Sequence, residues 1–364
     1  MLYRELGKTK ENVSIIGFGC RNLKNNEEKL LDYAIKSGIN LIDITPAYEK
    51  PIYNTSKIVG DYLNKNDLRN DILISAKSPL WKVNSQKLFN KFLDDQLENL
   101  QTDYIDIYQL YPLIGPDFNE YKKINILDSL NEALDDGKIK HVGFVGYMEM
   151  DYLVEILDDY PKFSVVSSQM SIVDNHYRSG EQGLDYLKDV NVGSIVLNPL
   201  RNDALINNVP DEINELYGDK TPLEWCLNYL INRDDVHTII QNFKSLDELK
   251  SFIKIAEDNY EFTDEDRDRL RMVASEYWSR KSNYCDICNH CLPCPQGVNI
   301  PYCFREYNIA KMLDDPKASA NHYYSLLDEN TRADACTMCK ECLNICPQMI
   351  NIPDEIEKVK ECFK

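Results

Sequence analysis

The first 260 or so residues alternate short β-like runs with longer amphipathic stretches. Eight runs are the strand candidates: Ser14–Ile16, Asn40–Asp43, Ile72–Ala76, Tyr104–Gln109, His141–Phe144, Val165–Met170, Gly193–Asn198 and His237–Ile240. The helix candidates between them include Glu27–Ser37, Ser85–Leu100, Leu127–Asp136, Leu223–Ile231 and Leu246–Ala256, with apolar residues at helical spacing. Eight strands, each followed by a crossover, in about 250 residues fit a (β/α)8 TIM barrel better than an open sheet.

Two further segments flank the expected barrel. Leu2–Glu5 and Val13–Ile16 are predicted to pair as a hairpin over the barrel floor. Thr263 has the character of a helix N-cap and is followed by three acidic residues, which predicts a helix that leads out of the barrel. We therefore expect a barrel over residues 1–262, a connecting helix over 263–280 and a small, mainly α-helical second domain over 281–364.

The charge balance narrows the choice of partners. The chain has 41 basic and 60 acidic residues, a net charge of −19 and a pI near 4.7. Such a chain repels nucleic-acid backbones and anionic lipid, so we expect neither as a partner. No apolar run approaches the roughly 18 residues that span a bilayer, and the N-terminus lacks the apolar region of a signal peptide. We expect a cytoplasmic protein.

Cysteine is concentrated at the C-terminal end. Only Cys20 and Cys226 of the 12 cysteines precede residue 280, and disulfides do not explain the others because cytoplasmic thiols are kept reduced. Eight of them form two runs, each closed by a proline: Cys285-x2-Cys288-x2-Cys291-x2-Cys294 and Cys336-x2-Cys339-x2-Cys342-x3-Cys346. The segments that follow, Cys294–Pro301 and Cys346–Pro353, are nearly the same and indicate an internal repeat. These spacings predict two [4Fe-4S] clusters.

The second run has the spacing of the bacterial ferredoxins, and in two-cluster ferredoxins the fourth cysteine of each run binds the other cluster. By this resemblance, one cluster takes Cys285, Cys288, Cys291 and Cys346, and the other takes Cys336, Cys339, Cys342 and Cys294. The segments Tyr302–Leu313 and His322–Asp328 are predicted helices, and they resemble the spacer of the α-helical ferredoxins found beside flavin dehydrogenases. Structural zinc, which also uses C-x2-C pairs, is the alternative.

Two more cysteines, Cys303 and Cys362, lie outside both runs. We expect them to act as small buried hydrophobic residues. A spare ligand is the alternative for Cys303, because the first run is one residue short before its last cysteine.

Polar residues follow several of the expected barrel strands. Asp43 ends the second strand, Tyr48 lies in the loop after it, Lys77 ends the third strand, and Tyr111 lies just beyond the fourth. Active sites of such barrels lie where the strands end, so these four residues are the candidate catalytic groups.

The chain resembles the aldo/keto reductases, and specifically their branch with a C-terminal iron–sulfur domain. The matching segments are Gly17–Gly19, Asn40–Tyr48, Ile74–Lys77, Leu100–Leu110, Gly137–Gly143 and Asn198–Leu200. The family reduces a carbonyl group with NAD(P)H by means of an Asp, a Tyr, a Lys and a His. The resemblance maps the first three onto Asp43, Tyr48 and Lys77, while Tyr111 stands at the position of the histidine. A nearby ammonium eases the ionisation of a phenol, whose ordinary pKa is about 10.

The cofactor segments of the family match less well. Gln169 matches the residue that holds the nicotinamide amide, and Lys244 is a candidate for contact with the 2′-phosphate of NADP(H). The family's small polar pair after the fifth strand is Val145-Gly146 here, and its glycine after the eighth strand falls near Asn242. The sequence therefore leaves open whether the barrel binds NADP(H).

Iron–sulfur clusters move single electrons, whereas a nicotinamide gives a hydride. In the favoured scheme, reduced ferredoxin or another one-electron donor feeds the clusters, which relay electrons to a small carbonyl-type substrate in the barrel mouth while Tyr48 supplies a proton. A NAD(P)H-dependent carbonyl reductase with appended clusters is the first alternative. A non-catalytic electron-transfer or docking protein is the second. No flavin signature is present, but barrels bind flavin phosphates without short motifs, which leaves a flavin open.

Overall fold

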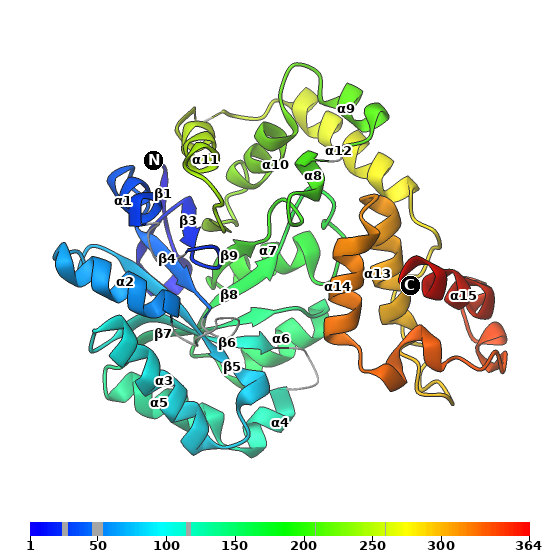
Figure 1. The fold of residues 1–364 in the computed structure, drawn as a ribbon, viewed down its shortest axis with the longest axis horizontal. Coiled ribbons are helices and arrows are strands. Elements are labelled where there is room, and N and C mark those ends of the chain that lie inside the picture. The colour runs from blue at the N-terminus through cyan, green and yellow to red at the C-terminus, as the bar shows by residue number, and fades with distance from the viewer. Residues whose placement is uncertain (24–27, 46–53, 114–117, 208, 259) are drawn as a thin grey trace. The chain divides into compact units, whose positions relative to one another are not determined.

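The computed structural model describes residues 1–23, 28–45, 54–113, 118–207, 209–258 and 260–364. Eight parallel strands close into a barrel in the order β10-β3-β4-β5-β6-β7-β8-β9 (Figure 1). The strands are β3 (Ile16–Gly19), β4 (Leu41–Ile44), β5 (Leu73–Pro79), β6 (Ile105–Leu113), β7 (Ile139–Gly146), β8 (Phe163–Gln169), β9 (Gly193–Leu197) and β10 (Thr238–Gln241). The (β/α)8 barrel predicted from the alternating pattern is confirmed.

Amphipathic helices surround the strands. They are α1 (Glu28–Lys36), α2 (Asn54–Lys65), α3 (Gln86–Leu100), α4 (Phe118–Lys123), α5 (Ile126–Asp135), α6 (Met150–Asp159), α7 (Gly180–Asp189), α10 (Pro222–Ile231) and α11 (Leu246–Asp258). Helix α3 is typical: it buries Phe89, Leu93 and Leu100 at helical spacing. None of the described helices combines the length and the apolar composition that a membrane crossing requires.

The first barrel strand differs from the sequence prediction. It runs over Ile16–Gly19, not Ser14–Ile16, because the preceding residues belong to the hairpin of β1 (Tyr3–Glu5) and β2 (Asn12–Ser14). The Ile15 N–H donates to the Leu2 carbonyl at 2.8 Å, which extends that hairpin by one bond. The hairpin itself was predicted, and its Leu6 and Val13 side chains belong to a buried cluster with side chains of five barrel strands.

A buried carboxylate fastens three strands at their amino ends. Asp106 in β6 is 1% exposed. Its Oδ2 accepts hydrogen bonds from Arg69 Nη2 and from the Ile74 N–H of β5, each at 2.9 Å, and its Oδ1 accepts one from Lys140 Nζ of β7, also at 2.9 Å. Strands β5, β6 and β7 therefore share one electrostatic anchor.

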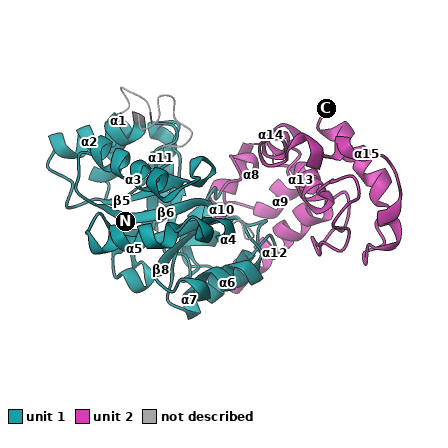
Figure 2. Cartoon of the chain, turned by 90° about the horizontal axis from the view of Figure 1, so that it is seen from below, with its two compact units in different colours: residues 1–199, 226–262 teal, residues 200–225, 263–364 magenta. Residues whose placement is uncertain are grey.

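The chain divides into two compact units, residues 1–199 with 226–262 and residues 200–225 with 263–364 (Figure 2). The second unit contains α8 (Ala204–Asn207), α9 (Asp211–Tyr217), α12 (Asp264–Ser279), α13 (Ile300–Met312), α14 (Pro316–Leu326) and α15 (Ile352–Cys362). The sequence pattern gave no sign that residues 200–225 belong with the second unit. They join the second unit because α9 packs on α12, where Arg269 Nη1 donates to the Leu216 carbonyl at 2.9 Å.

Helix starts in the second unit follow local capping signals. Thr263 and Asp266 form a reciprocal capping box at the start of α12, as its sequence predicted. Helix α14 begins six residues before the predicted His322, because the Asp315 side chain accepts a hydrogen bond from the Ala318 N–H and Pro316 fits the first turn.

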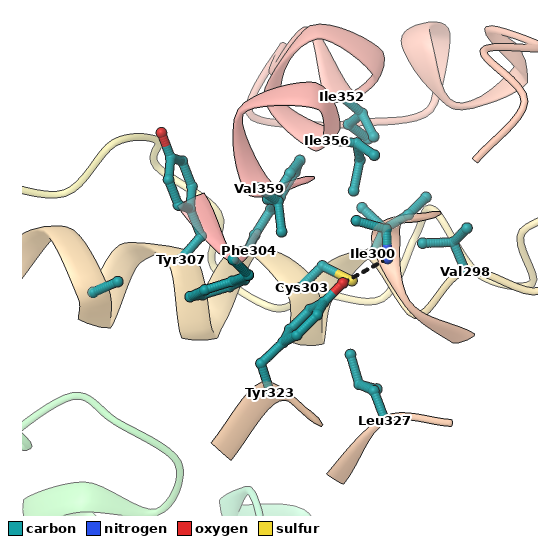
Figure 3. Close-up of a cluster of buried hydrophobic side chains, with 13 residues drawn as sticks. Val298, Ile300, Cys303, Phe304, Tyr307, Tyr323, Leu327, Ile352, Ile356 and Val359 are labelled. Carbon is teal, nitrogen blue, oxygen red and sulfur yellow. Dashed lines mark hydrogen bonds between the residues drawn. The ribbon is translucent and has the colours of Figure 1, made fainter. Parts of the chain in front are cut away.

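Three helices of this unit share one apolar core. Figure 3 shows Phe304 of α13, Tyr323 of α14 and Val359 of α15 converging, and all three are buried. The Tyr323 hydroxyl accepts a hydrogen bond from the Ala333 N–H at 2.7 Å. Six cysteines of the two runs pack against the edge of this core: Cys285, Cys291, Cys294, Cys336, Cys342 and Cys346.

The Asp106 anchor gives a stability prediction. Asp106→Ala removes the buried carboxylate that pairs with Arg69 and Lys140, and we expect it to lower the free energy of unfolding by about 3–5 kcal/mol. The control Asp94→Ala breaks only the exposed pair with Lys138 and should cost less than about 1 kcal/mol. Urea denaturation followed by circular dichroism measures both, and equal losses would contradict the assigned role of Asp106.

Candidate active site and candidate metal centre

A buried ion pair lies near the carboxyl ends of two neighbouring barrel strands. Lys77 Nζ of β5 donates to Asp43 Oδ2 of β4, and the two residues are 2% and 6% exposed. Burying two charges costs several kcal/mol unless further hydrogen bonds satisfy them. The second oxygen of Asp43 is satisfied by the Ser75 hydroxyl, which donates to Oδ1 at 2.8 Å.

The Asp43 carboxylate ends a chain of hydrogen bonds that all point the same way. The Ser167 hydroxyl donates to Gln109 Oε1 at 2.6 Å, and Gln109 Nε2 donates to Ser75 Oγ at 2.8 Å. Every member of this polar chain is buried. Bonds aligned in this way strengthen one another, and they stabilise the negative charge that holds the Lys77 ammonium.

Ser75, Gln109 and Ser167 were not among the site residues predicted from the sequence. Each is a polar residue within a mostly buried strand, which is a weak signal because the same strands hold other polar residues. Their mutual contacts depend on register across strands β5, β6 and β8, which no local pattern shows. Gln96 of α3 adds a bond from outside the strands, from its Nε2 to the Lys77 carbonyl at 3.1 Å.

The four candidate catalytic residues have different outcomes. Asp43 and Lys77 are brought together, whereas Tyr48 lies outside the described residues. Tyr111 is part of β6 itself and not of the loop beyond it, and Lys77 lies two residues before the end of β5. The Tyr111 ring packs edge-on against Trp81 at 5.7 Å and against Tyr147 at 6.5 Å, measured between ring centroids.

The loop after β10, where the resemblance implied phosphate contacts, satisfies its own donors. The Lys244 N–H donates to Glu248 Oε2 and the Gln241 side chain donates to Glu248 Oε1, each at 2.8 Å. Glu248 and Asp247 also make the first turn of α11 acidic. A helix N-terminus attracts phosphate through free N–H groups and positive partial charge, and here a carboxylate already occupies that position.

Asn242 fills the space next to Gly19, at the end of β3. Its Oδ1 accepts a hydrogen bond from the Arg21 N–H at 3.0 Å and would lie 2.6 Å from a Cβ atom added to Gly19. Gln169, the candidate nicotinamide contact, has its Nε2 at 3.5 Å from Asp174 Oδ1. The positions that the resemblance assigns to the nicotinamide cofactor, Gln169, Asn242 and Lys244, therefore all have hydrogen-bond partners within the chain.

The two cysteine runs share a backbone conformation around their second cysteine. In both, the residues just before and just after the second cysteine have positive φ: Ile287 and Asn289 in the first run, Met338 and Lys340 in the second. Each first cysteine also receives a hydrogen bond from the N–H two residues on, and for Met338 and Cys336 Sγ the N–S distance is 3.5 Å. Non-glycine residues rarely adopt the left-handed conformation, and such residues cluster at functional sites. Their matched positions indicate that both runs form the same kind of binding loop.

The repeat continues past the last cysteine of each run. The N–H groups of Gly297 and Met349 each donate to the carbonyl of the cysteine three residues before, at 2.8 and 3.0 Å, and both residues have positive φ. Helices α13 and α15 then begin at the isoleucine of the shared Asn-Ile-Pro sequence. The internal repeat seen in the sequence is therefore also a repeat of structure.

The thiols group across the runs. Burial and then the charges of neighbouring thiols raise the pKa of Cys291 to about 12, the neighbours being Cys285, Cys288 and Cys346. Burial also raises the pKa of Cys342, and its neighbours are Cys336, Cys339 and Cys294. Cys285, Cys288, Cys291 and Cys346 together line one pocket.

These two sets fit a [4Fe-4S] cluster each in donor chemistry, because every cluster needs four thiolates. Within the described residues, no three side chains of His, Cys, Asp or Glu are close enough together to hold a single metal ion. Cys303 is fully buried in the apolar core, as expected, whereas Cys362 is only partly buried and packs against that core.

Comparisons with known proteins match the barrel. The model of the Aldo/keto reductase family matches residues 16–274. The uncharacterized oxidoreductase YqkF of Bacillus subtilis (strain 168) is 24% identical over 293 residues, 70% of this chain and 91% of that protein. L-galactose dehydrogenase of Arabidopsis thaliana is 27% identical over 227 residues, 57% of this chain and 68% of that protein.

A solved structure has the same fold. The aldo-keto reductase AKR11C1 from Bacillus halodurans, in its holo form, is similar with a TM-score of 0.64 and 24% identity, over 75% of this chain and 96% of that chain. The family match ends at residue 274, so both cysteine runs lie outside it.

The polar chain gives a second prediction. Gln109→Leu leaves the buried Ser167 hydroxyl without its acceptor and removes the hydrogen bond that Ser75 accepts, and we expect a loss of about 1–3 kcal/mol in the free energy of unfolding. The same change at the exposed Gln182 of α7 should stay within about 0.5 kcal/mol. Denaturation curves of both variants measure these losses. An unchanged midpoint for Gln109→Leu would contradict a stabilising role for the hydrogen bonds of Gln109.

Proposed function

The chain belongs to the aldo/keto reductase family, and we propose that its barrel reduces the carbonyl group of a small organic substrate with electrons from two [4Fe-4S] clusters held by residues 281–364. The buried Asp43–Lys77 ion pair at the carboxyl ends of β4 and β5 is the observation that carries the chemistry. It keeps an ammonium group at the end of a barrel where active sites of this fold lie.

In this proposal Tyr48 is the proton donor. Lys77 favours the ionised phenol and so lowers the pKa of Tyr48 toward neutrality. Asp43 keeps Lys77 charged and oriented, and the hydrogen bonds from Ser75, Gln109 and Ser167 keep Asp43 in place.

Reduction of a carbonyl to an alcohol takes two electrons and two protons. Tyr48 gives the proton of the new hydroxyl group, and water gives the proton on carbon. The clusters, when bound, supply the two electrons. Tyr111 orients the substrate oxygen by a hydrogen bond, and its neutral phenol stabilises charge less than an imidazole would.

The two clusters are held by the crossed sets of cysteines. Support for this comes from the matched left-handed residues of the two runs and from the grouping of Cys346 with the first run. Backbone N–H groups directed at Cys285 and Cys336 would tune the reduction potentials.

We further propose that a one-electron donor such as reduced ferredoxin feeds the clusters. The Glu248 carboxylate and the Asn242 side chain support this choice over NADP(H), because both already accept backbone hydrogen bonds in the loops where the resemblance implies contacts to a pyrophosphate. We place the protein in the cytoplasm, where such donors are found.

Turnover tests the catalytic residues. With reduced viologen or ferredoxin as donor, Tyr48→Phe should lower kcat by about 10²–10⁴-fold, the usual contribution of a general acid. Tyr111→Phe should lose only about one neutral hydrogen bond, 0.5–1.5 kcal/mol. NADPH should not serve as donor. Full turnover by Tyr48→Phe would overturn the role of Tyr48 as proton donor, and turnover with NADPH would overturn the choice of donor. A wild type without turnover with any donor would leave the non-catalytic alternative.

Iron content tests the clusters separately. The protein purified without oxygen should hold about eight iron and eight sulfide ions per chain. Cys346→Ala should lose the cluster shared with the first run and keep the other, whereas the control Cys303→Ala should keep both. Four irons in the wild type, zinc in place of iron, or loss of only the second run's cluster would each contradict the assignment.

A further inference from the structure

Five side chains form a continuous row at the barrel mouth, here called the mouth row: Trp81, Tyr111, Tyr147, Tyr177 and Arg178. They come from the ends of β5 to β8 and the loops that follow them. The Arg178 guanidinium lies 4.7 Å from the Tyr147 ring centroid and 4.9 Å from that of Tyr177. The row therefore runs from the candidate catalytic Tyr111 to a single cation.

Arg178 has no hydrogen-bond partner for two of its donors. Its Nε and Nη1 atoms are buried and unpaired. The acidic groups closest to it in sequence are used elsewhere: Asp174 accepts from Ser171, and Glu181 pairs with Arg233 at 2.9 Å. Buried donors without an acceptor cost about 1–3 kcal/mol each. Arg178 therefore lowers the free energy of unfolding of the protein in this conformation.

The backbone also holds Arg178 in an unfavourable conformation. Its φ is +58°, a value that non-glycine residues rarely adopt. The flanking chain is pinned by the Tyr177 N–H on the Asp174 carbonyl at 2.9 Å and by the Ser179 N–H on the Met148 carbonyl at 3.1 Å. Strain of this kind is retained where a side chain must be presented in one direction.

We propose that Arg178 binds a carboxylate group of the substrate, so that the enzyme acts on carbonyl compounds that are carboxylic acids with a flat, unsaturated body. The proposal rests on the proposed function and names its substrate class. A guanidinium offers paired donors that match a carboxylate. A chain of net charge −19 repels anions, so an acid needs a local cation of this kind to bind.

The mouth row also accounts for the unsaturated body of the substrate. Trp81 is 46% exposed and stands beside Tyr111, so aromatic surface is open to a ligand there. A substrate with its carbonyl at Tyr111 and its carboxylate at Arg178 passes along the Tyr147 ring between them. A para-substituted benzene ring carries a carbonyl and a carboxylate at opposite ends, as this arrangement requires.

Equilibrium binding tests this without turnover. The probes are 4-acetylbenzoate and its neutral isostere 4-acetylbenzamide, titrated against the tryptophan fluorescence of the full chain with its clusters. We expect the wild type to bind the acid at least tenfold more tightly than the amide, and Arg178→Gln to bind both equally. The exposed control Arg271→Gln of α12 should keep the preference. Trp81→Phe should remove most of the signal.

Each outcome separates the two proposals. Equal affinity of the wild type for acid and amide overturns the role of Arg178, whether or not Arg178→Gln folds. A preference for the acid that survives in Arg178→Gln also overturns it. A preference that depends on Arg178, in a protein that reduces neither probe with any donor, supports the site and refutes only carbonyl reduction.

Discussion

An ammonium group withdrawn from water is the constraint on which the barrel site depends. Lys77 is 2% exposed, and its charge is tolerable only because Asp43 lies against it. Asp43 in turn needs donors for its other oxygen, and Ser75, Gln109 and Ser167 supply them in series. This series of hydrogen bonds forms only if four strands keep their register. The charged group at the barrel mouth therefore depends on correct closure of the barrel.

The fold could be predicted because its signals are local. Strand–helix alternation and apolar spacing within segments such as Gln86–Leu100 need no knowledge of distant residues. The predicted bounds were wrong where a residue pairs with a distant segment. The start of the first barrel strand was misplaced because Ile15 hydrogen-bonds to Leu2 in the hairpin. The site was harder to predict for the same reason: Asp43 and Lys77 stand in a known motif, whereas Gln109 and Arg178 gain meaning only from side chains of other strands and loops.

In the second unit the candidate site was easier to predict than the structure around it. Its cysteine spacings and repeated tails are visible in the sequence, and the structure adds a matched backbone, with positive φ at Ile287 and Met338 alike. No composition rule would have placed non-glycine residues there. The apolar core beneath the runs is built by three helices, while six run cysteines lie at its edge. Under the proposed assignment, a domain of this size with thiols at the margin of its core would gain much of its stability from the clusters that the thiols hold.

The self-capped start of α11 has an evolutionary consequence. Replacing Asn242 by a glycine would clear the space above Gly19 but leave the Glu248 carboxylate at the helix end. Replacing Glu248 would remove that carboxylate but leave the Asn242 side chain in place. Neither single substitution removes both groups, so a phosphate site at the start of α11 would take two changes in the same chain.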